Sequence, residues 1–230
     1  MLKLIRLELK KNRMGGYIKG VIIANLVIIA FLSLVYYGGI EEMDRLLQTY
    51  EGLFDMAGTI VKVTFVIFAS AIMSRMIIDE YKAKTIQLMF MYPISRKKIL
   101  AAKLMIIFVF TVVTILLSTA FIDALIIVVD RFFNIIEEPL TSTILAQTSI
   151  KVLITSLSAG GISLIPLFFG MRKYSTPATI ISSFLVVGLI SSNNGGVNLS
   201  DIIAIPITLG LVGVITAFLT IRNVNTKDVI

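Results

Sequence analysis

The sequence predicts an all-α integral membrane protein. Its 230 residues are 57% hydrophobic and only 15% charged, a balance outside the range of soluble domains. Long apolar stretches recur along it, close to the roughly 20 residues that a helix needs to cross a hydrocarbon core. They lack the strict alternation of barrel strands, and a helix satisfies its own backbone hydrogen bonds in lipid. We therefore expect one transmembrane domain over residues 1–230.

Six stretches meet the length expected of a transmembrane helix, although they are unequal. The fifth is short, and the third is long enough to tilt, break or protrude. Gly160-Gly161 and Pro166 are expected to give the fourth stretch close packing or a kink. In chain order the expected spans are Tyr17–Tyr37, Ala57–Ile78, Leu104–Val129, Thr143–Phe169, Thr176–Ser191 and Ile202–Ile221.

The basic residues predict the orientation of these spans. Of the 21 Lys and Arg, 17 fall in residues 1–20, 74–103, 170–175 and 222–230. Cytoplasmic segments of membrane proteins carry an excess of Lys and Arg. We therefore expect a multi-pass membrane protein with both termini in the cytoplasm.

The composition argues against catalysis by this chain. It contains no Cys and no His, so it lacks disulfides, thiolate ligands and the commonest general base. No G-x-x-x-x-G-K-[ST] phosphate-binding loop occurs. The net charge of +7 is explained by cations flanking apolar segments, where they meet anionic lipid rather than nucleic acid. We expect no catalytic, cofactor or metal site.

The first 14 residues predict an amphipathic helix that lies in the membrane interface. At 100° per residue, apolar residues share one arc and cations share the neighbouring arc, while Glu8 blurs the apolar edge. Such a helix buries its apolar arc at the acyl boundary and turns its cations toward lipid phosphates. A plain basic flank of the first span is the alternative. The residues expected to carry the interfacial contact are Leu2, Ile5, Arg6, Leu9 and Lys10.

A basic segment joins the second and third spans and reads DEYKAKTIQLMFMYPISRKKILAAK, residues 79–103. Apolar residues at helical spacing predict a helix over 79–92 along the inner membrane face. Glu80 and Lys84, four residues apart, are expected to pair on its solvent side, worth ~0.3 kcal/mol. Pro93 prevents its continuation, and Ser95 can cap the next helix. A solvated basic loop is the alternative.

This segment resembles the cytoplasmic loop of ABC-2-type permeases, the membrane subunits of ATP-driven exporters, in their compact six-span branch. That family has a Glu, then a Thr, a Leu-rich run, Pro-hydrophobic-Ser-Arg and a later Lys. The matching residues are Glu80, Thr85, Leu88, Pro93, Ile94, Ser95, Arg96, Ile99 and Lys103. Lys84 stands where the family usually has Gly. The resemblance implies motor coupling through Glu80, Tyr81, Lys84, Thr85, Leu88, Pro93, Ser95 and Arg96.

The resemblance also implies partners and a cargo. A cytoplasmic ABC ATP-binding subunit would hold ATP and Mg, and a second permease copy would complete a homodimer or heterodimer. Because the spans carry few charges, an amphipathic or hydrophobic cargo such as a peptide toxin or antimicrobial peptide is expected. Two other functions stay open from the sequence: a secondary carrier or channel, and a non-transporting membrane immunity or interaction protein.

Three charged residues fall inside the expected spans away from their cytoplasmic ends. Lys62, Asp123 and Lys151 lie on the outer portions of their helices, within reach of the interface. Anchoring at the interface is the favoured interpretation. The alternative is that Asp123 pairs with Lys62 or Lys151 and lines a substrate path.

Overall fold

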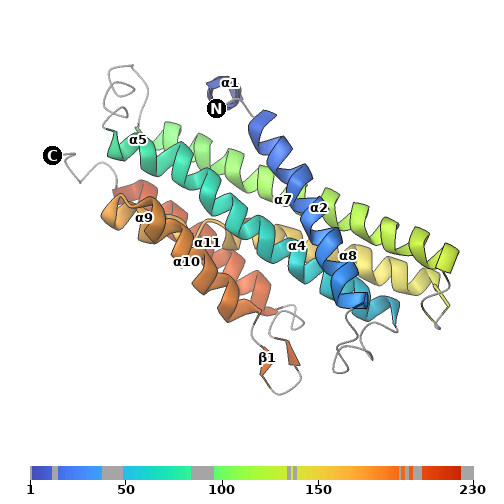
Figure 1. Cartoon of the computed structure of the whole chain (residues 1–230). Helices are drawn as coiled ribbons and strands as arrows, with labels where there is room; N and C mark the ends of the chain where they lie inside the picture. The colour runs from blue at the N-terminus through green and yellow to red at the C-terminus, as the bar shows by residue number, and fades with distance from the viewer. Residues whose placement is uncertain are drawn as a thin grey trace.

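The structure is a computed structural model that describes residues 2–11, 15–37, 49–83, 96–133, 136, 139–191, 193–194, 197–198 and 204–223. These residues form a helical bundle with one two-residue antiparallel ladder, β1 (Asn193–Asn194) with β2 (Val197–Asn198) (Figure 1). The helices are α1 (Leu2–Lys11), α2 (Gly15–Tyr37), α4 (Tyr50–Met73), the π-helix η1 (Ser74–Ile78), α5 (Asp79–Lys82), α7 (Arg96–Phe133), α8 (Ser142–Ile162), α9 (Pro166–Lys173), α10 (Thr176–Ile190) and α11 (Ala204–Asn223).

Among the described residues, five helical stretches are long and apolar enough to cross a membrane. They are Gly15–Val35, Tyr50–Lys82, Lys97–Phe133, Ser142–Arg172 and Ala204–Arg222. These helices confirm the prediction of a helical membrane protein. The fifth expected span corresponds to α10, an apolar helix of 15 residues that is shorter than the other five. Five of the six expected spans therefore have the full length, and the count of six stays a prediction.

Apolar side chains fill the bundle in three successive clusters. The first, which we call the end cluster, includes Met76, Tyr81, Ile107, Met171 and Ala217. Phe65 and Val187 belong to the middle cluster, and Tyr50 to a small cluster at the opposite end. Residues of α1 and α11 pack against the end cluster, so the first and last helices lie at the same end as α5 and α9 (Figure 1).

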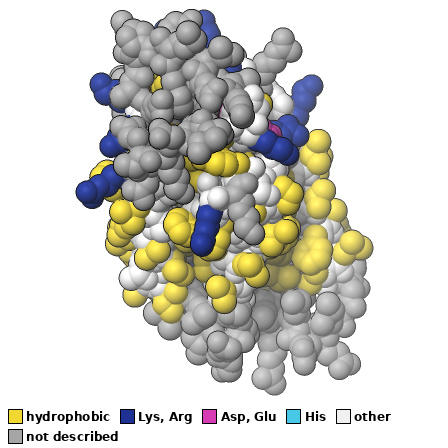
Figure 2. All heavy atoms as spheres, turned by 90° about the vertical axis from the view of Figure 1, so that its left-hand side faces the viewer, with side chains coloured by type: hydrophobic (Ala, Val, Ile, Leu, Met, Phe, Trp, Pro, Cys, Tyr) yellow, Lys and Arg dark blue, Asp and Glu magenta, His cyan; other side chains and the backbone are white. Residues whose placement is uncertain are grey.

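Lys and Arg side chains are exposed at that end of the bundle. In the view onto it they lie over the upper part of the face, and hydrophobic side chains cover much of the surface below (Figure 2). Large apolar side chains are also exposed along the spans, such as Leu34 of α2, 71% exposed, and Phe218 of α11, 63% exposed. Apolar exposure of this extent suits contact with acyl chains rather than with water.

Two helices begin well before the apolar stretches that predicted their spans. The third span belongs to one continuous helix that begins at Arg96, at the expected restart after Ser95 and eight residues before the apolar stretch at Leu104. The second begins at Tyr50, seven residues before Ala57, because the Thr49 side chain caps it by accepting a hydrogen bond from the Gly52 N–H at 3.3 Å. Both helices begin before their most apolar stretch. Capping and packing, which hydropathy does not report, decide where a helix begins.

The predicted coupling helix over 79–92 is only partly described, and its described part is not a separate element. The second span passes through η1 directly into α5, which ends at Lys82. The Asp79 N–H donates to the Ser74 carbonyl five residues back, the wider pairing of a π-helix. Residues 84–95 lie outside the described part of the chain.

The fourth span breaks where Gly160-Gly161 and Pro166 predicted close packing or a kink. After α8, a turn at Ser163–Ile165 leads into α9, whose first residue is Pro166. A Cβ added at Gly161 would lie 2.4 Å from the Gly210 carbonyl oxygen, and one at Gly213 would lie 2.0 Å from the Gly161 carbonyl oxygen. Backbones of α8 and α11 therefore touch directly, which is how small residues join helices in membranes.

Because of this contact, we expect substitutions at different glycines to differ in their effect on stability. Gly213→Ala and Gly161→Ala should each destabilise the protein by about 1–3 kcal/mol, because a methyl group must push α11 away from α8. The matched control is Gly188→Ala on α10, where an added Cβ meets nothing within 4 Å. Thermal unfolding of the purified protein in detergent would measure all three. Equal melting temperatures would contradict the close contact.

Candidate functional site

A cluster of four charged residues lies at the end of the bundle where α5 leaves the second span. Its centre is Lys103 of α7, whose side chain is 0% exposed. The Lys103 Nζ donates to the Met76 carbonyl oxygen at 2.7 Å and to the Glu80 carboxylate. Glu8 of α1 lies 3.8 Å from the same Nζ, and Lys11 of α1 binds Glu80 at 2.8 Å. We call these four residues the Lys103 cluster.

The cluster balances its charges, with Lys103, Glu8 and Glu80 largely buried and Lys11 half exposed. Two carboxylates face two ammonium groups, and Glu8 and Glu80 are themselves only 5% and 12% exposed in their side chains. A buried ammonium group is costly unless it is paired and hydrogen-bonded. The Met76 carbonyl can accept this bond because the π-helix η1, Ser74–Ile78, departs from α-helical pairing. The irregular turn and the buried lysine therefore stabilise each other.

These contacts join three elements that are distant in sequence. Glu80 belongs to α5, Lys103 to α7, and Glu8 and Lys11 to α1. Around them, Ile5 and Leu9 of α1 pack against the end cluster. The end of the second span, the start of the third and the N-terminal helix are thus connected by charge pairs and by apolar contact.

On its other side, α5 contacts the start of α10. The Asp79 carboxylate accepts a hydrogen bond from the Thr176 hydroxyl at 2.8 Å. The Tyr81 ring stacks on the Tyr174 ring, with centroids 5.5 Å apart. Tyr174 has φ 46°, the left-handed conformation that ends α9, and this turn directs its ring toward α5. Short as it is, α5 is fixed from two directions.

The structure corrects the expected setting of Glu80. It does not face solvent: its carboxylate points into the bundle and binds Lys103 and Lys11. Tyr81 is likewise 5% exposed and packs in the end cluster. Arg96 is the first residue of α7, as the expected restart after Ser95 requires, although its side chain is not described. The remaining expected coupling residues, Lys84, Thr85, Leu88, Pro93 and Ser95, lie outside the described residues.

The structure has an N-terminal helix, α1, in the segment expected to be amphipathic, but the surroundings of its apolar arc differ from the expectation. Ile5 and Leu9 contact the end cluster of the protein. Arg6 and Lys10 are exposed. Leu2 lies in α1, and its side chain is outside the described part. The location of α1 in the membrane interface stays a prediction. Part of its apolar arc is covered by the protein itself.

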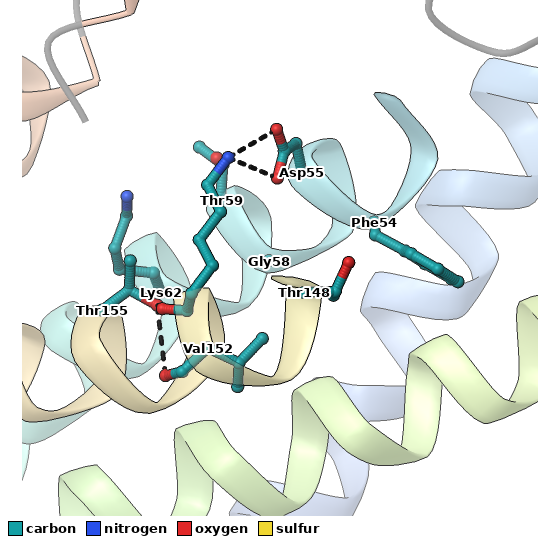
Figure 3. Close-up of a pocket in the computed structure, with 9 residues that line it drawn as sticks. Phe54, Asp55, Gly58, Thr59, Lys62, Thr148, Val152 and Thr155 are labelled. Carbon is teal, nitrogen blue, oxygen red and sulfur yellow. Dashed lines mark hydrogen bonds and ion pairs between the residues drawn. The ribbon is translucent and has the colours of Figure 1, made fainter. Parts of the chain in front are cut away.

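A polar cleft lies between α4 and α8 near the opposite end of the bundle (Figure 3). Lys62 and Lys151 both line it, together with Asp55. The Lys151 Nζ binds the two Asp55 carboxylate oxygens at 2.7 and 2.6 Å. Because these side chains are 35% and 37% exposed, water weakens the pair, and it contributes at most about 1 kcal/mol.

The alternative pairing of Asp123 with Lys151 is not found in the structure. Lys151 pairs with Asp55, which precedes the expected span Ala57–Ile78 but lies in the second turn of α4. Asp123 does not line the cleft that holds Lys62. Its Oδ1 is buried and has no hydrogen-bond partner among the described residues. The structure therefore brings the two lysines together and leaves Asp123 apart from their cleft.

Sequence reasoning missed the Lys103 cluster although two signals were present. Glu8 is a charge on the apolar arc of an amphipathic helix. Lys103 is separated from the basic run at residues 96–98 and directly precedes an apolar stretch. A charge in such surroundings calls for a buried partner. The described residues include no group of three or more side chains suited to hold a metal ion.

Removing the Lys103 ammonium group should strongly destabilise the protein. Lys103→Met would remove the buried positive charge that Glu8 and Glu80 share and leave the half-exposed Lys11 beside Glu80, at a cost of about 3–5 kcal/mol. Lys98→Met, an exposed lysine in the first turn of the same helix, should change stability by no more than about 0.5 kcal/mol. Thermal or denaturant unfolding in detergent would compare the two variants. A small and equal effect of both would rule out a structural role for the buried lysine.

Comparisons with known proteins identify the family to which the chain is similar. The family described as "ABC-2 family transporter protein" matches residues 4–191, from α1 to the end of α10. The chain is also similar to uncharacterized protein YcbO of Bacillus subtilis (strain 168), with 42% identity over 227 residues, 99% of this chain and 100% of that protein. No solved structure matches it.

In this family the chain is the membrane component of a transporter. The ATPase activity lies in separate subunits, and the permease typically works with an ATP-binding subunit. The match covers most of the sequence and coincides with a bundle containing five full-length apolar helices. The protein therefore belongs to the ABC-2 family of transporter membrane proteins.

Proposed function

We propose that this chain is the membrane-spanning subunit of an ATP-driven exporter. The observation that carries the proposal, beside family membership, is the Lys103 cluster. It attaches α5, at the cytoplasmic end of the second span, to the third span and to α1. A force applied near α5 by a separate motor would therefore move several helices together.

The motor would be a cytoplasmic ABC ATP-binding subunit that holds ATP and Mg. It would contact the segment after α5, residues 84–95, and the exposed cations on either side, Lys82, Lys97 and Lys98. Glu80 and Tyr81 would act from inside, by holding α5 against the bundle. In this proposal, the exposed residues of the segment contact the motor, and its buried residues attach α5 to the bundle.

The cargo proposed is amphipathic or hydrophobic, such as a peptide toxin or antimicrobial peptide. A groove of about 300 Å³ between α2 and α7 supports this class, since apolar side chains such as Leu26 and Phe121 line it. Its polar groups include Asn25 and Ser118, whose side chains hydrogen-bond at 2.9 Å. Two permease copies, identical or similar, would enclose the path between them.

The proposed topology has six crossings, with α10 as the short fifth span and both termini in the cytoplasm. The chain has no Cys, so single introduced cysteines can be labelled without background. In intact cells, a membrane-impermeant thiol reagent should label Glu51→Cys and leave Lys10→Cys and Arg222→Cys unlabelled until the membrane is opened. All three wild-type residues are exposed. Labelling of Lys10→Cys or Arg222→Cys in intact cells would overturn the orientation.

The motor contact can be tested by reversing one exposed charge. Lys82→Glu on α5 should lower both copurification of the ATP-binding subunit and its stimulated ATPase activity by about tenfold, because like charges would then oppose each other. The matched control is Arg131→Glu, the same reversal at an exposed site near the other end of the bundle. It should leave both readouts unchanged. Equal losses in the two variants would show that the effect is not one of docking.

A further inference from the structure

An open apolar groove runs along α9 and α10, away from the Lys103 cluster and from the polar cleft. It has a volume of about 720 Å³, within the range of pockets that hold small ligands. Phe169 and Arg172 of α9 line it, together with Ile181, Leu185 and Leu189 of α10. The two helices lie side by side at the surface of the bundle (Figure 1).

The walls of the groove suit a hydrocarbon chain. Ile181, Leu185 and Leu189 are 60%, 66% and 72% exposed and follow one another at intervals of four residues along one face of α10. Phe169, 47% exposed, adds an aromatic side chain from α9. A row of aliphatic side chains beside an open channel offers continuous apolar contact to a linear occupant.

One end of the groove carries a positive charge. Arg172 lies next to Met171 of the end cluster and forms no ion pair with another described residue. A guanidinium group presents a planar set of N–H donors that matches phosphate oxygens. The opposite end of the groove reaches Leu189, between Val187 and Ile190 of the middle cluster. The groove thus extends from the charged end of the bundle to its middle.

The groove is long enough to hold one acyl chain. From Ala178 to Leu189 the chain rises about 16 Å at about 1.5 Å per residue. An acyl chain that reaches the middle of a hydrocarbon core of about 30 Å extends about 15 Å. An occupant with its phosphate at Arg172 and an acyl chain along α10 would therefore fill the groove.

We propose that this groove is a binding site for an anionic phospholipid of the leaflet at the Lys103 end of the bundle. The Arg172 guanidinium binds the phosphate, and the row from Ile181 to Leu189 binds one acyl chain. The proposal rests on the membrane location of the chain and does not involve ATP or cargo.

Fluorescence quenching tests the site directly, because the chain has no Trp. Phe169→Trp would place a single reporter in the groove of the full-length protein, reconstituted in phosphatidylcholine vesicles. Lipid with brominated acyl chains, which quench Trp on contact, is added as either phosphatidylglycerol or phosphatidylcholine at the same fraction. The ratio of the two quenching efficiencies gives the lipid preference at the groove. We expect about a fivefold preference for phosphatidylglycerol, the contribution of one cation at an anionic surface.

Variants assign that preference to Arg172. Arg172→Gln should bring the ratio at the Phe169→Trp reporter to about one, while Arg172→Lys should retain most of it. Lys98→Gln, an exposed cation at the same end on α7, should leave it unchanged. A second reporter, Val109→Trp on the exposed face of α7, should give the same ratio with and without Arg172→Gln.

Three results would overturn the proposal. The first is a ratio near one at Phe169→Trp in the protein with Arg172 intact. The second is a preference that Arg172→Gln does not change, or changes equally at Val109→Trp. The third is protection of the Phe169→Trp reporter from both brominated lipids, which would show that protein, such as a second copy of the chain, covers the groove.

Discussion

The burial of one ammonium group, that of Lys103, constrains the end of the bundle that we propose faces the cytoplasm. Lys103 has no water to bind, so Glu8, Glu80 and the Met76 carbonyl must all approach it. That requirement fixes where α1 lies, how the second span ends and where the third begins. Apolar packing alone would permit these helices to slide or rotate, because in lipid one aliphatic contact is much like another. The charges make the arrangement specific.

The opposite end of the bundle is held differently. Its ion pair between Lys151 and Asp55 is more than a third exposed, so water shares the charges and the attraction is weak. Asp130 receives a hydrogen bond from the Tyr50 hydroxyl and another from the Ile136 N–H at 2.8 Å, which connects the start of α4 to the segment after α7. These are local connections between neighbouring elements. The molecule thus combines one buried charged junction with an end that has looser polar contacts.

Hydropathy and the distribution of cations were enough to predict the helical class and the centres of the long spans, because a bilayer imposes both length and composition. The break before Pro166 was also foreseeable, since proline lacks an N–H donor. The direction of Glu80 was not. Its partners, Lys103 and Lys11, are 23 and 69 residues away in sequence, and local spacing favoured Lys84 instead. Similarly, nothing near Lys151 in sequence indicates Asp55. Sequence patterns report neighbours along a helix, whereas these pairs depend on which helix faces which.

The π-helix at Ser74–Ile78 determines the direction in which the last residues of the second span point. A π-turn accommodates one residue more than an α-turn, and each residue of an α-helix advances about 100° around the axis. Were these five residues α-helical, everything after them would be rotated by about that angle, and the Glu80 carboxylate would leave the side of the helix that faces α7. Deleting a residue within Ser74–Ile78 would therefore alter the azimuth of α5 while preserving the hydropathy of the span. The irregular turn acts as an angular offset between the membrane-embedded part of this helix and its protruding end.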